Sequence, residues 1–124
     1  MSTPPRHLAV LVLTACLALT LSACSSDDGD DGGSTTRATT IAGLKGDQTA
    51  GKTTYDNTCA ACHKVDGTGD IGPNLVTGAK AALTVTAVAT VVVDGQGTMP
   101  SYSTLTDQDI ANTISYVKGQ LAGK

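Results

Sequence analysis

The sequence predicts a compact all-α domain of three main helices within residues 44–124, and two segments carry most of this prediction. Asp47 is a residue type that caps helix N-termini, and a helix can run from it to the cysteines at Cys59 and Cys62. Residues 106–109 open a last helix with acids in its first turn, where the helix dipole favours them. The apolar positions that follow share one face and are Ile110, Ile114, Val117 and Leu121.

The segment between these two helices is ambiguous. Residues 83–95 read LTVTAVATVVVDG, and their β-branched side chains favour a strand by propensity. Val88, Val91 and Val92 also fit one face of a helix, with Gly95 as its C-terminal stop. Periodicity alone does not choose between these two possibilities.

The N-terminus has the layout of a bacterial export signal. A short positive segment precedes a continuous apolar run over residues 8–21, which is shorter than the roughly 20 residues of a membrane span. Residues 21–24, LSAC, resemble a lipoprotein lipobox, in which Cys24 is lipidated and becomes the first mature residue. We therefore expect a signal peptide over residues 1–23. The alternatives are the second match, LTAC at 13–16, ordinary cleavage near Ala23, and an uncleaved anchor.

Residues 24–43 are expected to form an acidic disordered linker behind the lipid anchor. They contain four aspartates and almost nothing to bury, so the sequence offers little to offset the entropy of folding. The remaining chain, residues 44–124, is expected to be the folded domain. It has six lysines against seven aspartates, a net charge of −1, so its charge gives no basis for binding nucleic acid or an anionic membrane surface.

The folded part is poor in large side chains. The whole chain has no Phe, no Trp and three Tyr. Aromatic side chains usually dominate core burial, and a domain of this size is already limited in the area that it can bury. A large, flat, apolar cofactor would fill such a core.

The motif with the most chemical content is Cys59-Ala-Ala-Cys62-His63. Cys-x-x-Cys-His is typical of covalent c-type haem attachment. On a helix, positions i, i+3 and i+4 share a face, so two thiols can reach the two vinyl groups of one porphyrin while the imidazole lies under the iron. The alternatives are a thioredoxin-like redox pair, a structural zinc site, which would need about four ligands, and a surface pair of cysteines.

A candidate for the second iron ligand is Met99. Apart from Met1 it is the only methionine, and it lies in the Gly-rich, Pro-flanked segment GQGTMPSY at 95–102. A lone methionine is more often core filler, but filler is less expected in such a loop. A thioether opposite an imidazole raises the reduction potential of the iron.

Together these residues resemble the class I cytochromes c, in a compact bacterial form that includes lipoproteins. CAACH resembles the attachment motif, IGPNL at 71–75 the proximal loop, and GTMP at 97–100 the methionine loop. The resemblance implies one covalent haem c on Cys59 and Cys62, axial ligands His63 and Met99, and a hydrogen bond from His63 to the carbonyl of Pro73. It also implies that residues 83–95 are helical, and that Gly51 and Tyr55 cross the last helix near Tyr116.

The function implied by this resemblance is one-electron transfer, without enzymatic activity of its own. The expected partners are redox proteins, namely a membrane oxidase, reductase or dehydrogenase, and the expected state is a monomer. The expected location is the outer face of the cytoplasmic membrane or the periplasm, with the lipid at Cys24 as anchor. Two alternatives remain: a haem-based binder or sensor of small ligands with an open or displaceable sixth position, and a haem subunit dedicated to one oxidoreductase.

Overall fold

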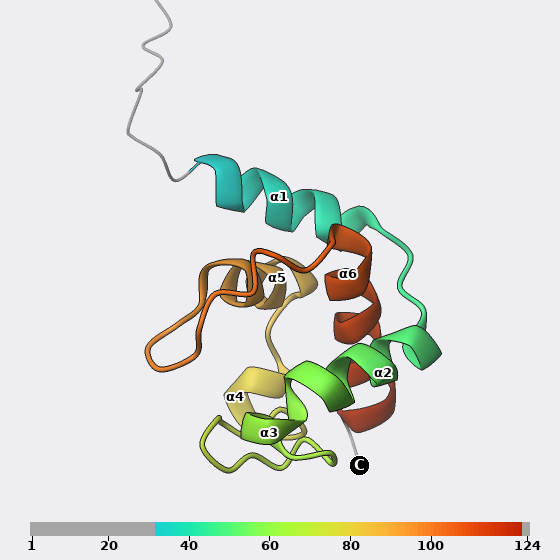
Figure 1. Cartoon of the computed structure of the whole chain (residues 1–124), viewed down its shortest axis with the longest axis vertical. Helices are drawn as coiled ribbons and strands as arrows, with labels where there is room; N and C mark the ends of the chain where they lie inside the picture. Colours follow the sequence, from blue (N-terminus) through green and yellow to red (C-terminus); the bar gives the residue numbers. More distant parts are fainter. Residues whose placement is uncertain (1–31, 123–124) are drawn as a thin grey trace, which may run out of the picture.

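A computed structural model describes residues 32–122 of the chain (Figure 1). Within this range the regular elements are helical, and the only β-type pairing is an isolated bridge between Gln96 and Met99. The predicted all-α class is therefore confirmed. The predicted signal peptide, Cys24 and residues 25–31 lie outside the described part. In chain order the elements are α1 (Gly32–Gly43), α2 (Gln48–Thr58), α3 (Ala60–His63), α4 (Gly78–Ala81), α5 (Val85–Asp94), α6 (Asp107–Tyr116) and the π-helical turn η1 (Val117–Leu121).

Helices α2 and α6 cross in close contact, and this crossing fixes the frame of the domain. Asp47 caps α2 by accepting a 2.8 Å hydrogen bond from the backbone N–H of Ala50. Gly51 is buried against α6 so tightly that a methyl group there would lie 2.0 Å from the carbonyl oxygen of Asn112. One turn later, the rings of Tyr55 and Tyr116 pack with centroids 5.5 Å apart. The expected crossing of Gly51 and Tyr55 with the last helix near Tyr116 is confirmed.

The valine-rich segment is a helix, α5, rather than a strand. Thr84 caps it by accepting a hydrogen bond from Ala87 N–H, and Gly95 ends it at φ +80°, in the region that favours glycine. Ala89 and Val93 are buried on its inner face. Tertiary packing of this apolar face therefore outweighs the β propensity of the individual valines.

Helix α6 starts as predicted. Thr106 caps it by accepting a 3.1 Å hydrogen bond from Asp109 N–H. Along α6 the predicted apolar positions Ile110 and Ile114 are buried. The helix continues without a break into η1, whose Leu121 is also buried.

Helix α1 corrects the prediction of a disordered linker, which is wrong for residues 32–43. In Figure 1 this helix lies across α5, close to the start of α6. Its side chains Ala38 and Ile41 have no exposed surface and belong to the same core cluster as Ala89 and Ile110. The Thr-rich composition gives the segment little helix propensity of its own, so packing on α5 and α6 supplies the stability. None of the helices within residues 32–122 has the length and apolar character needed to cross a membrane.

Candidate haem site

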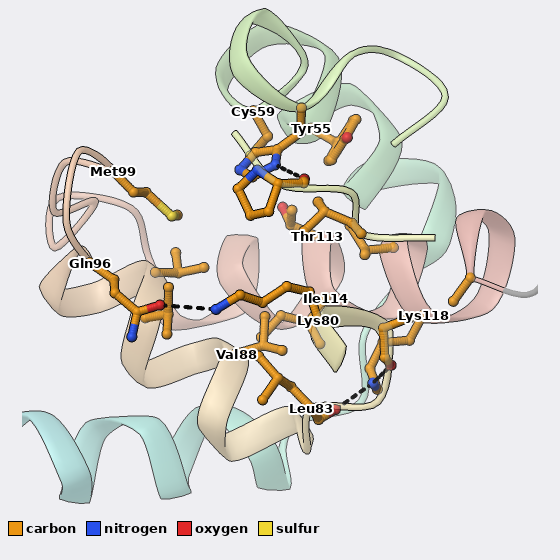
Figure 2. A pocket seen from close by; sticks show the side chains of 18 residues that line it. Tyr55, Cys59, Lys80, Leu83, Val88, Gln96, Met99, Thr113, Ile114 and Lys118 are labelled. Atoms are coloured by element: carbon orange, nitrogen blue, oxygen red, sulfur yellow. Dashed lines mark hydrogen bonds between the residues drawn. The ribbon is translucent and has the colours of Figure 1, made fainter. Parts of the chain in front are cut away.

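The Cys-x-x-Cys-His motif lies where α2 ends and the short helix α3 begins. Cys59 caps the C-terminus of α2, and its N–H donates to the carbonyl of Tyr55. The N–H groups of Cys62 and His63 then both donate to the carbonyl of Cys59, at 3.1 and 3.0 Å. Cys59 and His63 border an adjoining cavity, at whose edge Figure 2 shows Cys59. Cys62 does not line this cavity but borders a neighbouring hollow together with Cys59 and His63.

The imidazole of His63 is buried and held in one orientation. Its Nδ1 lies 2.9 Å from the carbonyl oxygen of Pro73, which is the contact that the resemblance implied. A nitrogen next to a carbonyl oxygen at this distance carries the proton, so Nε2 is the nitrogen with a free lone pair. This tautomer and this restraint are the ones that a metal-binding histidine needs.

Gly72 is a site residue that the sequence analysis did not identify. A methyl group at this position would lie 2.6 Å from Cε1 of His63, so the flat face of the imidazole rests directly on the glycine backbone. The backbone N–H of Gly72 donates to the carbonyl of Cys62 at 2.9 Å, which holds this loop against the attachment motif. The available signal was the glycine immediately before Pro73, because a glycine can mark a close approach of backbone to another group.

Met99 lies on a loop that is fixed at both ends. The loop leaves α5 at Gly95, and Gln96 and Met99 exchange two backbone hydrogen bonds of 3.1 and 3.0 Å. Farther on, the N–H of Tyr102 donates to the carbonyl of Val92 in α5 at 2.9 Å. The half-buried side chain of Met99 points into the cavity that Cys59 also borders (Figure 2). Loop geometry therefore brings Met99 to the same space as the histidine.

The cavity is almost entirely apolar. Its empty space amounts to roughly 890 Å³ when the part that is open to solvent is included. His63 and Met99 both line it. Its apolar walls come from four segments of the chain and comprise Leu75, Leu83, Val88, Val91, Val92, Ile114 and Val117.

The cavity also explains why the described core is divided. One buried cluster is formed by α1, α5 and α6, and a second is formed around Tyr55, Val76, Tyr116 and Leu121. The cavity is bordered by members of both clusters, including Ile114 and Tyr55. The shortage of aromatic side chains thus coincides with an apolar space between the two clusters, and the histidine and methionine donors that line this space suit a flat apolar group with a metal at its centre.

The Cys59 thiol does not have the character of a reactive redox cysteine. Burial, and secondarily the nearby Cys62, raises the pKa of the Cys59 thiol to about 11. Thioredoxin-like motifs instead lower the pKa of their reactive cysteine, so that a thiolate is available near neutral pH. Within residues 32–122 the structure shows no cluster of three or more His, Cys, Asp or Glu side chains that could hold a metal ion by themselves.

The sequence family of the chain follows from comparison with known proteins. No curated protein sequence matches the chain significantly. Among solved structures, cytochrome CL from the marine methylotrophic bacterium Methylophaga aminisulfidivorans matches with 24% sequence identity and a TM-score of 0.49, covering 59% of this chain and 54% of that chain. The present chain thus matches only about half the length of that protein. Residues 46–117 match the sequence family described as cytochrome c oxidase, cbb3-type, subunit III. The chain therefore belongs to this family of c-type cytochromes and is a small monohaem cytochrome c with covalently bound haem c.

Proposed function

We propose that this protein is a membrane-anchored one-electron carrier whose iron is held by His63 and Met99. The observation that carries the proposal is the convergence of an oriented imidazole and a thioether on one apolar cavity beside Cys59. In this proposal Cys59 and Cys62 form the covalent links to the haem. When bound, the haem supplies reversible one-electron chemistry at its iron.

The residues of the chain set the conditions for that chemistry. Pro73 holds the imidazole of His63 in the tautomer that presents Nε2, and Gly72 permits its close approach to the loop. Met99 offers a thioether, which favours the reduced state and therefore a higher reduction potential. The apolar walls would limit the access of water to the haem, and if His63 and Met99 both hold the iron, no position for a substrate remains on it. The protein is thus proposed to carry electrons rather than to act as an enzyme.

The membrane anchor is proposed from the sequence around Cys24. If Cys24 carries lipid, only residues 25–31 separate it from the first residue of α1, and seven residues span at most about 25 Å when fully extended. The carrier, expected as a monomer, would remain close to the outer face of the cytoplasmic membrane or to another periplasmic membrane surface. Such a tether raises the effective concentration of the carrier near membrane-bound redox partners.

Among these partners a respiratory oxidase is favoured. The description of the matching family names a subunit of a cytochrome c oxidase, so a role as a dedicated haem subunit is the second form of the proposal. Purification under mild detergent distinguishes the two forms. A dedicated subunit co-purifies with one oxidase in a fixed ratio, whereas a mobile carrier is recovered free and is oxidised by membranes that contain the oxidase.

The central test is the optical spectrum of the full chain produced with a haem-attachment system. We expect a sharp c-type spectrum when reduced, and in the oxidised state the weak sulfur-to-iron band that reports a methionine ligand. Met99→Ala should abolish that band, lower the potential and allow carbon monoxide to bind the reduced iron. Absence of covalent haem would overturn the proposal. Haem without the sulfur-to-iron band in the unaltered protein would instead support a binder of small ligands.

The anchor has its own test. Cys24→Ala should move the protein from the membrane fraction to the soluble fraction, while the spectrum stays unchanged. Retention of the variant on membranes would contradict the lipid anchor but not electron transfer.

A further inference from the structure

The cavity has a distinct charge distribution in addition to its apolar walls. Among the described residues that line it, Lys80 and Lys118 are the two whose side chains carry a full charge at neutral pH, and both are positive. Within residues 32–122 no carboxylate side chain borders the cavity. Its other titratable groups are Tyr55 of α2, whose pKa burial raises further, together with Cys59 and His63 of the attachment motif.

Neither lysine forms an ion pair within the described part of the chain. The two ion pairs found there join Arg37 to Asp107 and Lys52 to Asp56. Nζ of Lys118 donates instead to the carbonyl oxygens of Ala81 and Leu83, at 3.3 and 2.7 Å. Nζ of Lys80 lies 3.2 Å from Oε1 of Gln96. An ammonium group has three donors, so one hydrogen remains available on Lys118 and two on Lys80.

The position of these ammonium groups is specific as well. In Figure 2 Lys80 and Lys118 lie on the side of the cavity away from Cys59. The vinyl and propionate substituents of protoporphyrin occupy opposite edges of the ring. A porphyrin linked through its vinyl edge to Cys59 and Cys62 therefore directs its two propionates toward the side where the two lysines lie.

We propose that Lys80 and Lys118 bind the two haem propionates, an inference that rests on the proposed haem site. Two positive groups then meet two carboxylates, which leaves the cavity close to electrical balance. Charged groups next to an apolar space are costly unless they are paired, and a hydrogen-bonded pair of opposite charges removes much of that cost. The lysines also come from separate elements, α4 and η1, so the propionates would join these elements across the cavity.

The same placement gives the lysines an effect on the iron. A positive charge near the haem favours the reduced state, because the ferrous form carries one positive charge less than the ferric form. Removing either lysine should therefore lower the reduction potential. If the two lysines only stabilised the fold, removing either one would not lower the reduction potential in a consistent way.

The experiment measures the reduction potential of the haem-loaded full chain at pH 8, where an unpaired carboxylate stays ionised. Lys80→Met and Lys118→Met remove the charge but keep an apolar stem, and Lys118→Arg retains the charge. Lys45→Met is the matched control, because Lys45 is exposed and does not line the cavity. We expect lower potentials for the two cavity variants, and values close to the unaltered protein for Lys118→Arg and Lys45→Met.

A second readout addresses the carboxylates directly. The infrared difference spectrum between the oxidised and reduced protein should show propionate bands that move in Lys80→Met and Lys118→Met but not in Lys45→Met. Lys80 is exposed, so its variant should fold even if Lys118→Met loosens the contact with residues 81–83. Potentials and bands equal to those of Lys45→Met would overturn the inference and leave the haem site standing. Failure of the unaltered chain to bind haem would overturn both.

Discussion

Helix α1 is expected to be part of the folding unit, and Ile41→Ala tests this. Ile41 has no exposed surface and packs in the cluster that also contains Ala38, Ala89 and Ile110. The substitution removes three buried carbons, each worth about 0.8 kcal/mol, or about 2.4 kcal/mol in total. The cavity left behind adds to this loss, and measured Ile→Ala changes lie at about 2–5 kcal/mol. We expect a loss of about 2–4 kcal/mol in the free energy of unfolding.

The assay is urea unfolding of the haem-loaded chain, followed by circular dichroism and by the haem absorbance. Thr40→Ala is the matched control, because Thr40 is exposed on the same helix and a surface change of this kind stays within about 0.5 kcal/mol. The two probes should unfold together in both variants. If Ile41→Ala is as stable as Thr40→Ala, α1 does not contribute to the cooperative unit, and the reasoning from its burial is refuted.

Three further predictions concern the frame of the haem site. Gly51→Ala gains about 1 kcal/mol of helix propensity but places a methyl 2.0 Å from a carbonyl oxygen of α6, so overpacking of about 1–3 kcal/mol or more should give a net loss of stability in urea unfolding. Gly43→Ala, where a methyl meets nothing within 4 Å, is the control, and equal losses in the two variants would contradict the close crossing. Gly72→Ala should displace the imidazole that rests on this glycine, which would change the oxidised spectrum and lower the potential; an unaltered spectrum would show that the contact is not needed. Burial raises the pKa of Tyr55 above its ordinary value of 10.0, so folding favours the neutral phenol. The contribution of Tyr55 to stability should therefore be constant below about pH 10 and be lost as the pH rises beyond it. Tyr55→Phe loses the 2.8 Å hydrogen bond to a backbone carbonyl and should be about 1 kcal/mol less stable at pH 8. Its stability should also decrease less steeply above pH 10 than that of the unaltered protein. An equally steep decrease would show that groups other than Tyr55 cause the loss of stability.

Much of the frame could be predicted from the sequence because its signals are local. The cap at Asp47, the acids in the first turn of α6, the apolar face of this helix and the spacing of the attachment motif each depend on a few neighbouring residues. The valine-rich segment could not be assigned by periodicity alone, since a short apolar run fits both a strand and a helix. Its helical state is decided by packing against α1 and α6, which is not a local property.

What the sequence did not reveal depends on residues far apart in the chain. Helix α1 has few apolar residues, and its two buried side chains have partners in α5 and α6. The role of Gly72 depends on where the imidazole of His63 lies, and the position of Lys118 beside the cavity depends on the path of η1. The shortage of aromatic residues did predict a space for a cofactor, because that prediction needs only the composition of the chain and not the positions of its residues.

Helix α1 also connects the N-terminal side of the chain to the loop that carries Met99. Ser34 donates to Asp94 at 2.6 Å, at the point where α5 ends and this loop begins. Arg37 binds the other end of the loop, donating to the carbonyls of Ser103 and Leu105 and to the Asp107 carboxylate. The match to the family begins only at residue 46, so α1 lies outside it. Helix α1 nevertheless covers the buried faces of α5 and α6 and contacts both ends of the methionine loop. The unit that holds the methionine in place therefore includes α1.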